Sequence, residues 1–207
     1  MPTTNRDLEL LHPIFQKNME LIVATIQKKL PKDFTCKMIS GHRTQSEQFD
    51  LYKQGRTFRN GTWVKDKSKG GIVTNINGIT KLSNHNYLPC ISMDMGIFDN
   101  KGTYLSDSPL YNFVKEGAKI IKADWGGDWN SIKDTPHIEL NKAQYFKYNV
   151  IREVDYQWQK LLAKDGTYKG AMDGFFGTKG FEALKKTTGL SIRNIESWKI
   201  LVKKVGI

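Results

Sequence analysis

Apolar and polar residues alternate with a period of two between residues 91 and 98. This period is typical of a β-strand that buries one face in the core, so Asp94 would project from the other face of a rigid element. Residues 137–140 form a second, shorter run of this kind, and Pro136 restricts the backbone just before it. The apolar positions of the first run are Ile91, Met93, Met95 and Ile97.

Helical spacings and turn signals organise much of the remaining sequence up to residue 82. Apolar residues at spacings of three and four predict a helix over residues 5–30, with Pro13 near its beginning. Residues 35–40 are expected to form a strand, and Thr44-Gln45-Ser46-Glu47 is a capping box that begins the next helix. Residues 57–82 are rich in glycine, asparagine, lysine and threonine, which predicts a long loop.

The second half of the chain indicates two units. Ser108-Pro109 begins a helix that is expected to run to about Ala123. Residues 1–150 would therefore form an α+β unit in which helices pack on a small antiparallel sheet. Residues 154–207 carry three helical patterns separated by glycines and predict a small three-helix C-terminal domain. A plain helical extension of the first unit is the alternative.

The chain is strongly basic, with 32 Lys and Arg against 21 Asp and Glu and a formal net charge of +11. This balance favours polyanionic partners such as nucleic acid, anionic lipid or a bacterial wall with its carboxylates and phosphates. No basic block or zinc-finger spacing indicates nucleic acid, and no run is long and apolar enough to cross a membrane. The two cysteines are far apart and predict no disulfide scaffold, and Cys90 is expected to be a buried free thiol.

Four polar residues carry the candidate chemistry: His85, Asp94, His137 and, three positions before the last, Asp134. Two imidazoles and a carboxylate are a natural zinc set, because a three-ligand catalytic zinc site leaves one position open for water. A carboxylate that is not a ligand can take a proton from that water. Taken singly, a His or Asp on a strand is more often a hydrogen-bonded structural residue. His12 is expected to be a surface or capping residue.

The surroundings of these residues follow a recognisable order between residues 35 and 140. The segments are Ser40-Gly41-His42-Arg43-Thr44 with Glu47-Gln48, Leu51-Tyr52-Lys53-Gln54-Gly55-Arg56-Thr57, Val73-Thr74-Asn75, Ser83-Asn84-His85-Asn86-Tyr87, Trp125-Gly126-Gly127-Asp128-Trp129 and Asp134-Thr135-Pro136-His137. In order and spacing they resemble the zinc peptidase family of D-alanyl-D-alanine carboxypeptidases and L-alanyl-D-glutamate endopeptidases, which cut peptidoglycan stem peptides. The resemblance is to the endopeptidase branch, which is well represented among phage endolysins.

The resemblance implies a role for each matching residue. The zinc ligands would be His85, Asp94 and His137, and the catalytic carboxylate would be Asp134. The matching arginine, Arg43, would bind substrate and stabilise developing negative charge.

Further matches and departures bear on the substrate. Gln48, Ser83 and Trp129 would bind substrate or shape the cleft. Two departures affect the expected substrate preference: Leu88-Pro89-Cys90 lengthens one loop, and His42 stands where tyrosine is common. His42 is expected near the substrate, although not as a ligand.

The C-terminal unit resembles a three-helix peptidoglycan-binding domain, whose hallmark is the turn Asp173-Gly174-Phe175-Phe176-Gly177. With the resemblance of the first unit, it implies a zinc-dependent, phage endolysin-type hydrolase of the L-alanyl-D-glutamate bond, with peptidoglycan as its partner. We expect a monomer without nucleic acid or membrane insertion. The polar N-terminus lacks a secretory segment, which predicts retention in the host cytoplasm until lysis. The alternatives are a D-alanyl-D-alanine carboxypeptidase, a catalytically silent wall-binding protein and a nucleic-acid-binding protein.

Overall fold

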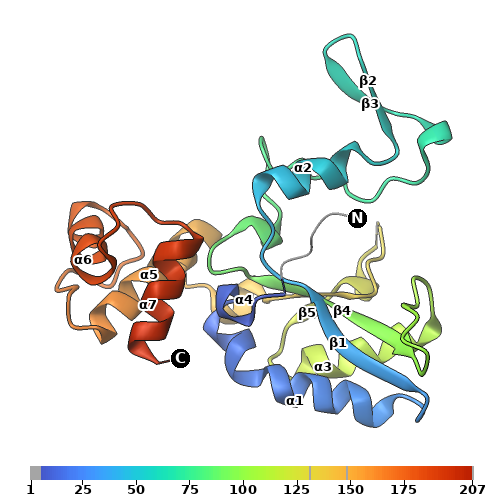
Figure 1. Ribbon diagram of the computed structural model, residues 1–207, viewed down its shortest axis with the longest axis horizontal. Helices are drawn as coiled ribbons and strands as arrows, with labels where there is room; N and C mark the ends of the chain where they lie inside the picture. The colour runs from blue at the N-terminus through green and yellow to red at the C-terminus, as the bar shows by residue number, and fades with distance from the viewer. Residues whose placement is uncertain (1–5, 131, 148, 207) are drawn as a thin grey trace.

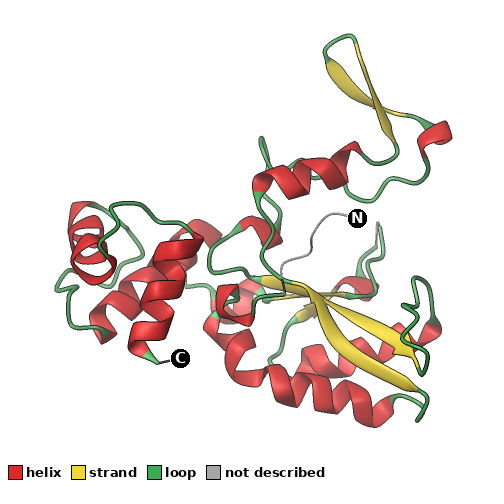
Figure 2. Cartoon of the chain, viewed as in Figure 1, coloured by secondary structure: helices red, strands yellow, loops and turns green. Residues whose placement is uncertain are grey.

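The computed structural model describes residues 6–130, 132–147 and 149–206. Its centre is a four-stranded antiparallel sheet with strand order β1-β4-β6-β5 (Figures 1 and 2). Helices α1 (Pro13–Lys29) and α3 (Val114–Ile120) pack against each other below the sheet in Figure 1. The α+β class with a small antiparallel sheet is confirmed. The strands are β1 (Phe34–Ser40), β4 (Ser92–Asp99), β5 (Asp124–Trp125) and β6 (His137–Glu139).

Strand β4 is the middle of the core, and its apolar period of two is confirmed. All four alternating side chains of residues 91–97 are fully buried, and they pack in one core with apolar residues of α1 and α3. The other face of β4 carries Ser92, which is fully buried, and Asp94, which is partly exposed. A largely buried carboxylate needs partners, so this face of the sheet is where chemistry is expected.

The N-terminal helix is shorter than predicted. It begins at Pro13 rather than at residue 5, after a 3-10 turn, η1 (Leu8–Leu10). The reason is tertiary: the Cys90 amide donates to the Leu10 carbonyl, and the His12 amide donates to the Cys90 carbonyl, both at 2.8 Å. His12 caps the helix, because its Nδ1 accepts from the Ile14 amide. The predicted capping role is therefore present, whereas the alternative surface position is wrong, since His12 is buried.

Residues 57–82 are not all loop, contrary to the prediction. Strands β2 (Arg56–Arg59) and β3 (Thr62–Lys65) form a hairpin that projects from the body above α2 (Gln45–Lys53) (Figure 1). Both turn residues have positive φ, 48° at Asn60 and 77° at Gly61, as a two-residue hairpin turn requires. Asn-Gly between two β-prone runs is a strong hairpin signal, which outweighs the loop-like polar composition of the segment.

The remaining elements are short. The helix predicted from Ser108 begins with Ser108 as its cap, runs first as the 3-10 turn η4 (Pro109–Phe113) and ends at Ile120 instead of Ala123. The predicted capping box at the start of α2 is present. In the described part of the chain, no helix combines the length and apolarity needed to span a membrane. The other short elements are η2 (Lys67–Lys69), η3 (Asn84–Asn86), η5 (Gly126–Asp128) and α4 (Lys142–Tyr145).

The C-terminal residues form three mutually packed helices. They are α5 (Val150–Lys164), α6 (Thr178–Thr188) and α7 (Ile195–Val205). Trp158 and Trp198 meet at their centre with ring centroids 4.7 Å apart. The turn between α5 and α6 is held by Gln159, which donates to Asp173 Oδ1 and accepts from the Gly174 amide. Asp173 in turn accepts from the Phe175 amide, as expected for this turn.

These three helices dock on the rest of the protein through both tryptophans. The Trp158 indole donates to the Leu88 carbonyl at 2.8 Å, and the Trp198 indole donates to the Glu9 carbonyl at 2.7 Å. Both rings are buried and belong to one continuous apolar core with the sheet and α1. The lengthened Leu88-Pro89-Cys90 loop therefore provides a docking point for α5. A division into units 1–150 and 154–207 stays a prediction.

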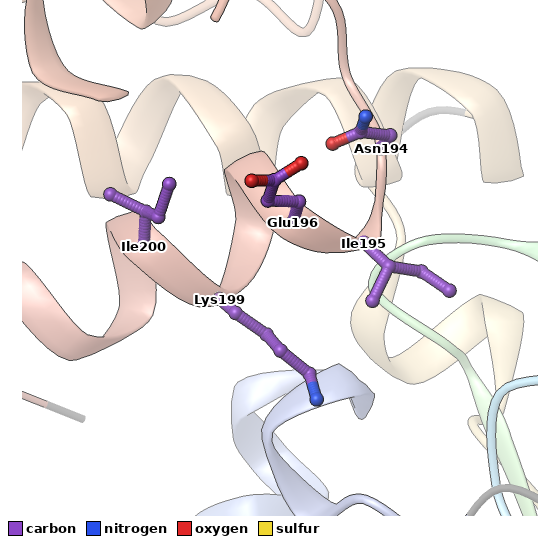
Figure 3. A pocket seen from close by; sticks show the side chains of 5 residues that line it. All are labelled: Asn194, Ile195, Glu196, Lys199 and Ile200. Atoms are coloured by element: carbon purple, nitrogen blue, oxygen red, sulfur yellow. The ribbon is translucent and has the colours of Figure 1, made fainter. Parts of the chain in front are cut away.

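Trp198→Ala should lower the free energy of unfolding by about 3–5 kcal/mol, the usual cost of removing a large buried aromatic side chain. It deletes the fully buried ring and removes one of the two donors to the Glu9 carbonyl, the other being the Gln16 side chain. Ile200→Ala is the matched control, because Ile200 lies on the same helix, near Lys199 in Figure 3, but is 36% exposed, and it should cost less than about 1 kcal/mol. Urea unfolding measures both values. Equal values for the two variants would contradict the docking role.

Candidate metal centre

Three elements bring the predicted metal ligands together. Asp94 of β4 lies directly opposite His137 of β6 in the antiparallel register. Directly opposed residues point to the same face of a sheet, so the two side chains meet there. His85 comes from η3, whose cap is Ser83, and its ring reaches the same point. The ligand atoms of the three residues all lie within 4.8 Å of one another.

The distances within this cluster fit a tetrahedral metal. His85 Nε2 is 3.3 Å from His137 Nδ1 and 3.4 Å from Asp94 Oδ1, and His137 Nδ1 is 2.9 Å from that oxygen. Ligand bonds of about 2.0–2.1 Å at tetrahedral angles place ligand atoms roughly 3.3 Å apart, which is close to these separations. Two imidazole nitrogens and a carboxylate oxygen are also the donor types that zinc accepts.

The opposite nitrogen of each imidazole is held by a second partner. His85 Nδ1 lies 2.7 Å from the Gly41 carbonyl, so it carries the proton and leaves Nε2 free as a ligand. His137 Nε2 lies 3.2 Å from Glu139 Oε2, so Nε2 carries a proton and Nδ1 is the nitrogen that faces the cluster. Asn84 donates to the same Glu139 oxygen at 2.6 Å. Such partners set the tautomer and orientation of a metal-binding imidazole.

Arg43 is anchored beside the cluster. Its guanidinium donates to Gln48 Oε1 at 2.8 Å, to Ser40 Oγ at 3.1 Å and to Asp94 Oδ2 at 3.4 Å. Gln48 is buried and donates to the Ile76 carbonyl, so it orients Arg43 and ties down the loop after the hairpin. Ser83 accepts from the His85 amide and so supports that ligand's turn.

Asp134 and Trp129 also border the cluster, in a segment organised by Gly126. The Asp134 and Trp129 amides both donate to the Gly126 carbonyl. A Cβ at position 126 would lie 2.3 Å from the Asp134 carbonyl oxygen and 3.0 Å from His137 Cβ, so only glycine fits there without a shift. The Trp129 ring packs on the His137 ring with centroids 5.0 Å apart.

These groups line a cleft of about 1160 Å³. All eight residues singled out from the sequence as ligands, catalytic groups or substrate contacts border it, and His42 lies there too. Their convergence is a fact of the structure, whereas the role of each stays a prediction. The eight are Arg43, Gln48, Ser83, His85, Asp94, Trp129, Asp134 and His137.

Comparison with known proteins decides the family. No family model matches the chain. The peptidoglycan L-alanyl-D-glutamate endopeptidase CwlK of Bacillus subtilis (strain 168) is 32% identical over 139 residues, which cover 63% of this chain and 73% of that protein. The chain belongs to the peptidoglycan L-alanyl-D-glutamate endopeptidase family. The crystal structure of the Serratia marcescens L-Ala D-Glu endopeptidase ChiX aligns with a TM-score of 0.41 and 19% identity, over 69% of this chain and 90% of that one.

In this endopeptidase family member, burial and neighbouring charges shift the pKa values of the cluster. Burial alone would raise the pKa of Asp94, but the charge and hydrogen bonds of the two imidazoles hold it well below its usual range. Burial alone would lower the pKa of His137, but its hydrogen bonds to Asp94 and Glu139 raise it to about 10. Burial, with the Asp94 charge adding to it, raises the pKa of Asp134 to about 6. An elevated carboxyl pKa is what a proton-transferring group requires.

The cysteines take no part in this centre. Both are buried free thiols, as expected for Cys90, and burial raises the pKa of each to about 12. A thiol with so high a pKa does not supply a thiolate nucleophile near neutral pH.

Glu139 is the residue that sequence reasoning missed. It lies two positions after His137 in the same strand, and the period of two predicts that both side chains share a face. Glu139→Ala should weaken zinc affinity by about 10–100-fold, because the His137 ring loses the partner that fixes its orientation. Glu139→Gln keeps an oxygen acceptor and should lose less. Competition with a chromophoric chelator measures both, and unchanged affinity in the alanine variant would exclude this role.

Proposed function

We propose that this protein is a zinc-dependent peptidoglycan peptidase that hydrolyses the L-alanyl-D-glutamate bond of the stem peptide. The observation that carries the proposal is the convergence of His85, Asp94 and His137 beside the half-buried Asp134. The CwlK relative, whose name states this bond, supports the choice of substrate. The cleft offers room for a peptide next to the cluster.

In the proposed mechanism His85, Asp94 and His137 hold the metal. When bound there, zinc lowers the pKa of water towards about 7 and polarises a carbonyl. Asp134 accepts the proton of the attacking water and later passes it to the leaving amine. Its raised pKa suits both halves of that transfer, since the carboxyl group must take up a proton and release it again near neutral pH.

Arg43 is proposed to stabilise the developing negative charge or to grip a substrate carboxylate. Its planar guanidinium stays charged and presents five N–H donors. Hydrogen bonds to Gln48, Ser40 and Asp94 hold it in place beside the cleft. Because the anchor is in place before substrate arrives, little reorganisation is needed at the moment of reaction. Trp129 and Ser83 would complete the substrate contacts on either side of the cluster.

The biological setting we infer is that of a phage endolysin. The net charge of +11 supports attraction to the carboxylates and phosphates of a bacterial wall. Residues 154–207 would target the enzyme to peptidoglycan as a three-helix binding domain. The protein would act as a monomer without nucleic acid, held in the host cytoplasm until lysis.

Mass spectrometry of purified peptidoglycan after digestion, with and without a chelator, tests this proposal. We expect a chelator-sensitive new N-terminus at D-glutamate. Release of D-alanine alone would instead assign the protein to D-alanyl-D-alanine carboxypeptidases. Binding to the wall with no product at all would leave a non-catalytic wall protein.

A further inference from the structure

The β2–β3 hairpin projects from the body of the protein beyond α2 (Figure 1). Within the described residues its two strands pair only with each other, and Figures 1 and 2 show it standing clear of the body. Contacts within the hairpin close its base, where Thr57 donates to Asp66 at 2.6 Å and the Asp66 amide donates to the Gly55 carbonyl. Arg56 joins this base to neighbouring segments by donating to the Tyr52 carbonyl and, at 3.1 Å, to Asn75. An isolated hairpin is marginally stable in water, so these contacts hold it in place.

A row of aromatic rings runs from α2 to the tip of this hairpin. Phe58 and Trp63 are opposed in the strand register and share one face, with ring centroids 5.4 Å apart. Trp63 meets Phe49 of α2 at 6.1 Å, and Phe49 stacks on Tyr52 at the same distance. The inner rings pack on one another, whereas Phe58 is 57% exposed at the outer end. We call these four residues the aromatic row.

Positive charge surrounds the aromatic row. Residues 56–69 contain five Arg and Lys against a single Asp. Four of the five cations have exposed side chains, and only Arg56 is buried. An exposed aromatic ring flanked by cations offers both an apolar face and positive charge to a partner. The exposed cations are Arg59, Lys65, Lys67 and Lys69.

The aromatic row is continuous with the cleft. Helix α2 carries Gln48 and Leu51 on the cleft wall and Phe49 and Tyr52 in the row. The chain that returns from the hairpin also lines the cleft, through Val73 and Thr74. Helix α2 therefore connects the cleft wall to the aromatic row, so a polymer with one branch in the cleft could reach the hairpin over α2.

We propose that the aromatic row and its flanking cations bind the carbohydrate strand of the wall polymer whose peptide branch enters the cleft. This inference rests on the proposed function, since it identifies the partner from the substrate of that same site. Sugar rings present apolar C–H faces that pack on an aromatic ring, and the polymer's carboxylates complement the exposed Arg and Lys. The hairpin thus extends the substrate site beyond the peptide.

Phe58→Ala tests the proposal, because an exposed side chain can be removed without loss of the fold. Two quantities are measured on the full chain: Kd for purified peptidoglycan sacculi by co-sedimentation, and kcat/KM on a soluble stem peptide without sugar. We expect Kd to rise about fivefold or more, with kcat/KM within twofold of the parent and an unchanged Tm. Adding Arg59→Gln and Lys65→Gln should weaken sacculus binding further. Leu21→Ala, which removes a 54% exposed apolar side chain from α1, is the control and should change neither quantity.

The other outcomes are equally defined. An unchanged Kd for both the single and the triple variant, with the fold intact, overturns the proposal. An equal loss on the soluble peptide also overturns it, because Phe58 would then belong to the peptide site. If Phe58→Ala instead lowers the affinity for anionic phospholipid vesicles or oligothymidylate and leaves the affinity for sacculi unchanged, the carbohydrate strand is not the partner. A parent that cleaves no peptide at all refutes the proposed function, while the sacculus Kd values still report on the hairpin.

Discussion

Asp134→Ala should retain its zinc and lower kcat by about 10²–10⁴-fold, the usual contribution of a general base and acid. The side chain borders the cleft but lies outside the cluster of three ligand atoms, so its loss removes proton transfer and leaves the metal set complete. Metal analysis of the purified protein and kcat on a soluble stem peptide measure the two effects separately.

Asp128→Ala is the matched control for this variant. Asp128 lies in η5 on the same segment, but its exposed side chain pairs with Lys115 at the surface. It should keep both zinc and turnover. Loss of zinc from Asp134→Ala would instead make that carboxylate a ligand, and full activity would remove it from the mechanism.

His137→Ala should weaken zinc binding by more than about 100-fold. Loss of a hydrogen-bond partner of a ligand costs up to about 100-fold in metal affinity, and loss of the ligand itself should cost more. The substitution removes one of three ligand atoms and also the ring on which Trp129 packs. Turnover at limiting zinc should fall in parallel. Equilibrium dialysis against zinc, followed by activity at saturating zinc, separates lost affinity from lost chemistry.

His42→Ala provides the comparison for a nearby imidazole. His42 is buried at the same cleft, yet it is not part of the cluster, and burial lowers its pKa to about 4. It should keep the parent's zinc affinity. If the two histidine variants hold zinc equally well, the ligand set is not the one proposed.

Local sequence signals were sufficient for several elements. The period of two in residues 91–97 identified β4, and the Thr44-Gln45-Ser46-Glu47 capping box identified the start of α2. Both signals act within a few residues, through side-chain alternation and a cap hydrogen bond. The Asn60-Gly61 turn is an equally local signal for the hairpin, although the composition of residues 57–82 predicts a loop.

Other features depend on contacts between distant segments. The N-terminal helix is shortened because Leu10 and His12 pair with Cys90, about 80 residues away. The local sequence around Leu10 and His12 does not indicate this pairing, and neither does the sequence around Cys90. The docking of Trp158 and Trp198 on backbone carbonyls of the first half is of the same kind.

The residue types of the centre and the family resemblance follow from the sequence, because motif order and spacing are written along the chain. The meeting of His85, Asp94 and His137 within 4.8 Å is instead a product of the folded chain. Strand register opposes Asp94 to His137, and the η3 turn then carries His85 to them. In the folded chain Glu139 also orients His137, and Gly126 sets the position of Asp134. The physical reason is that such distances arise from packing between segments far apart in the chain, which no local pattern encodes.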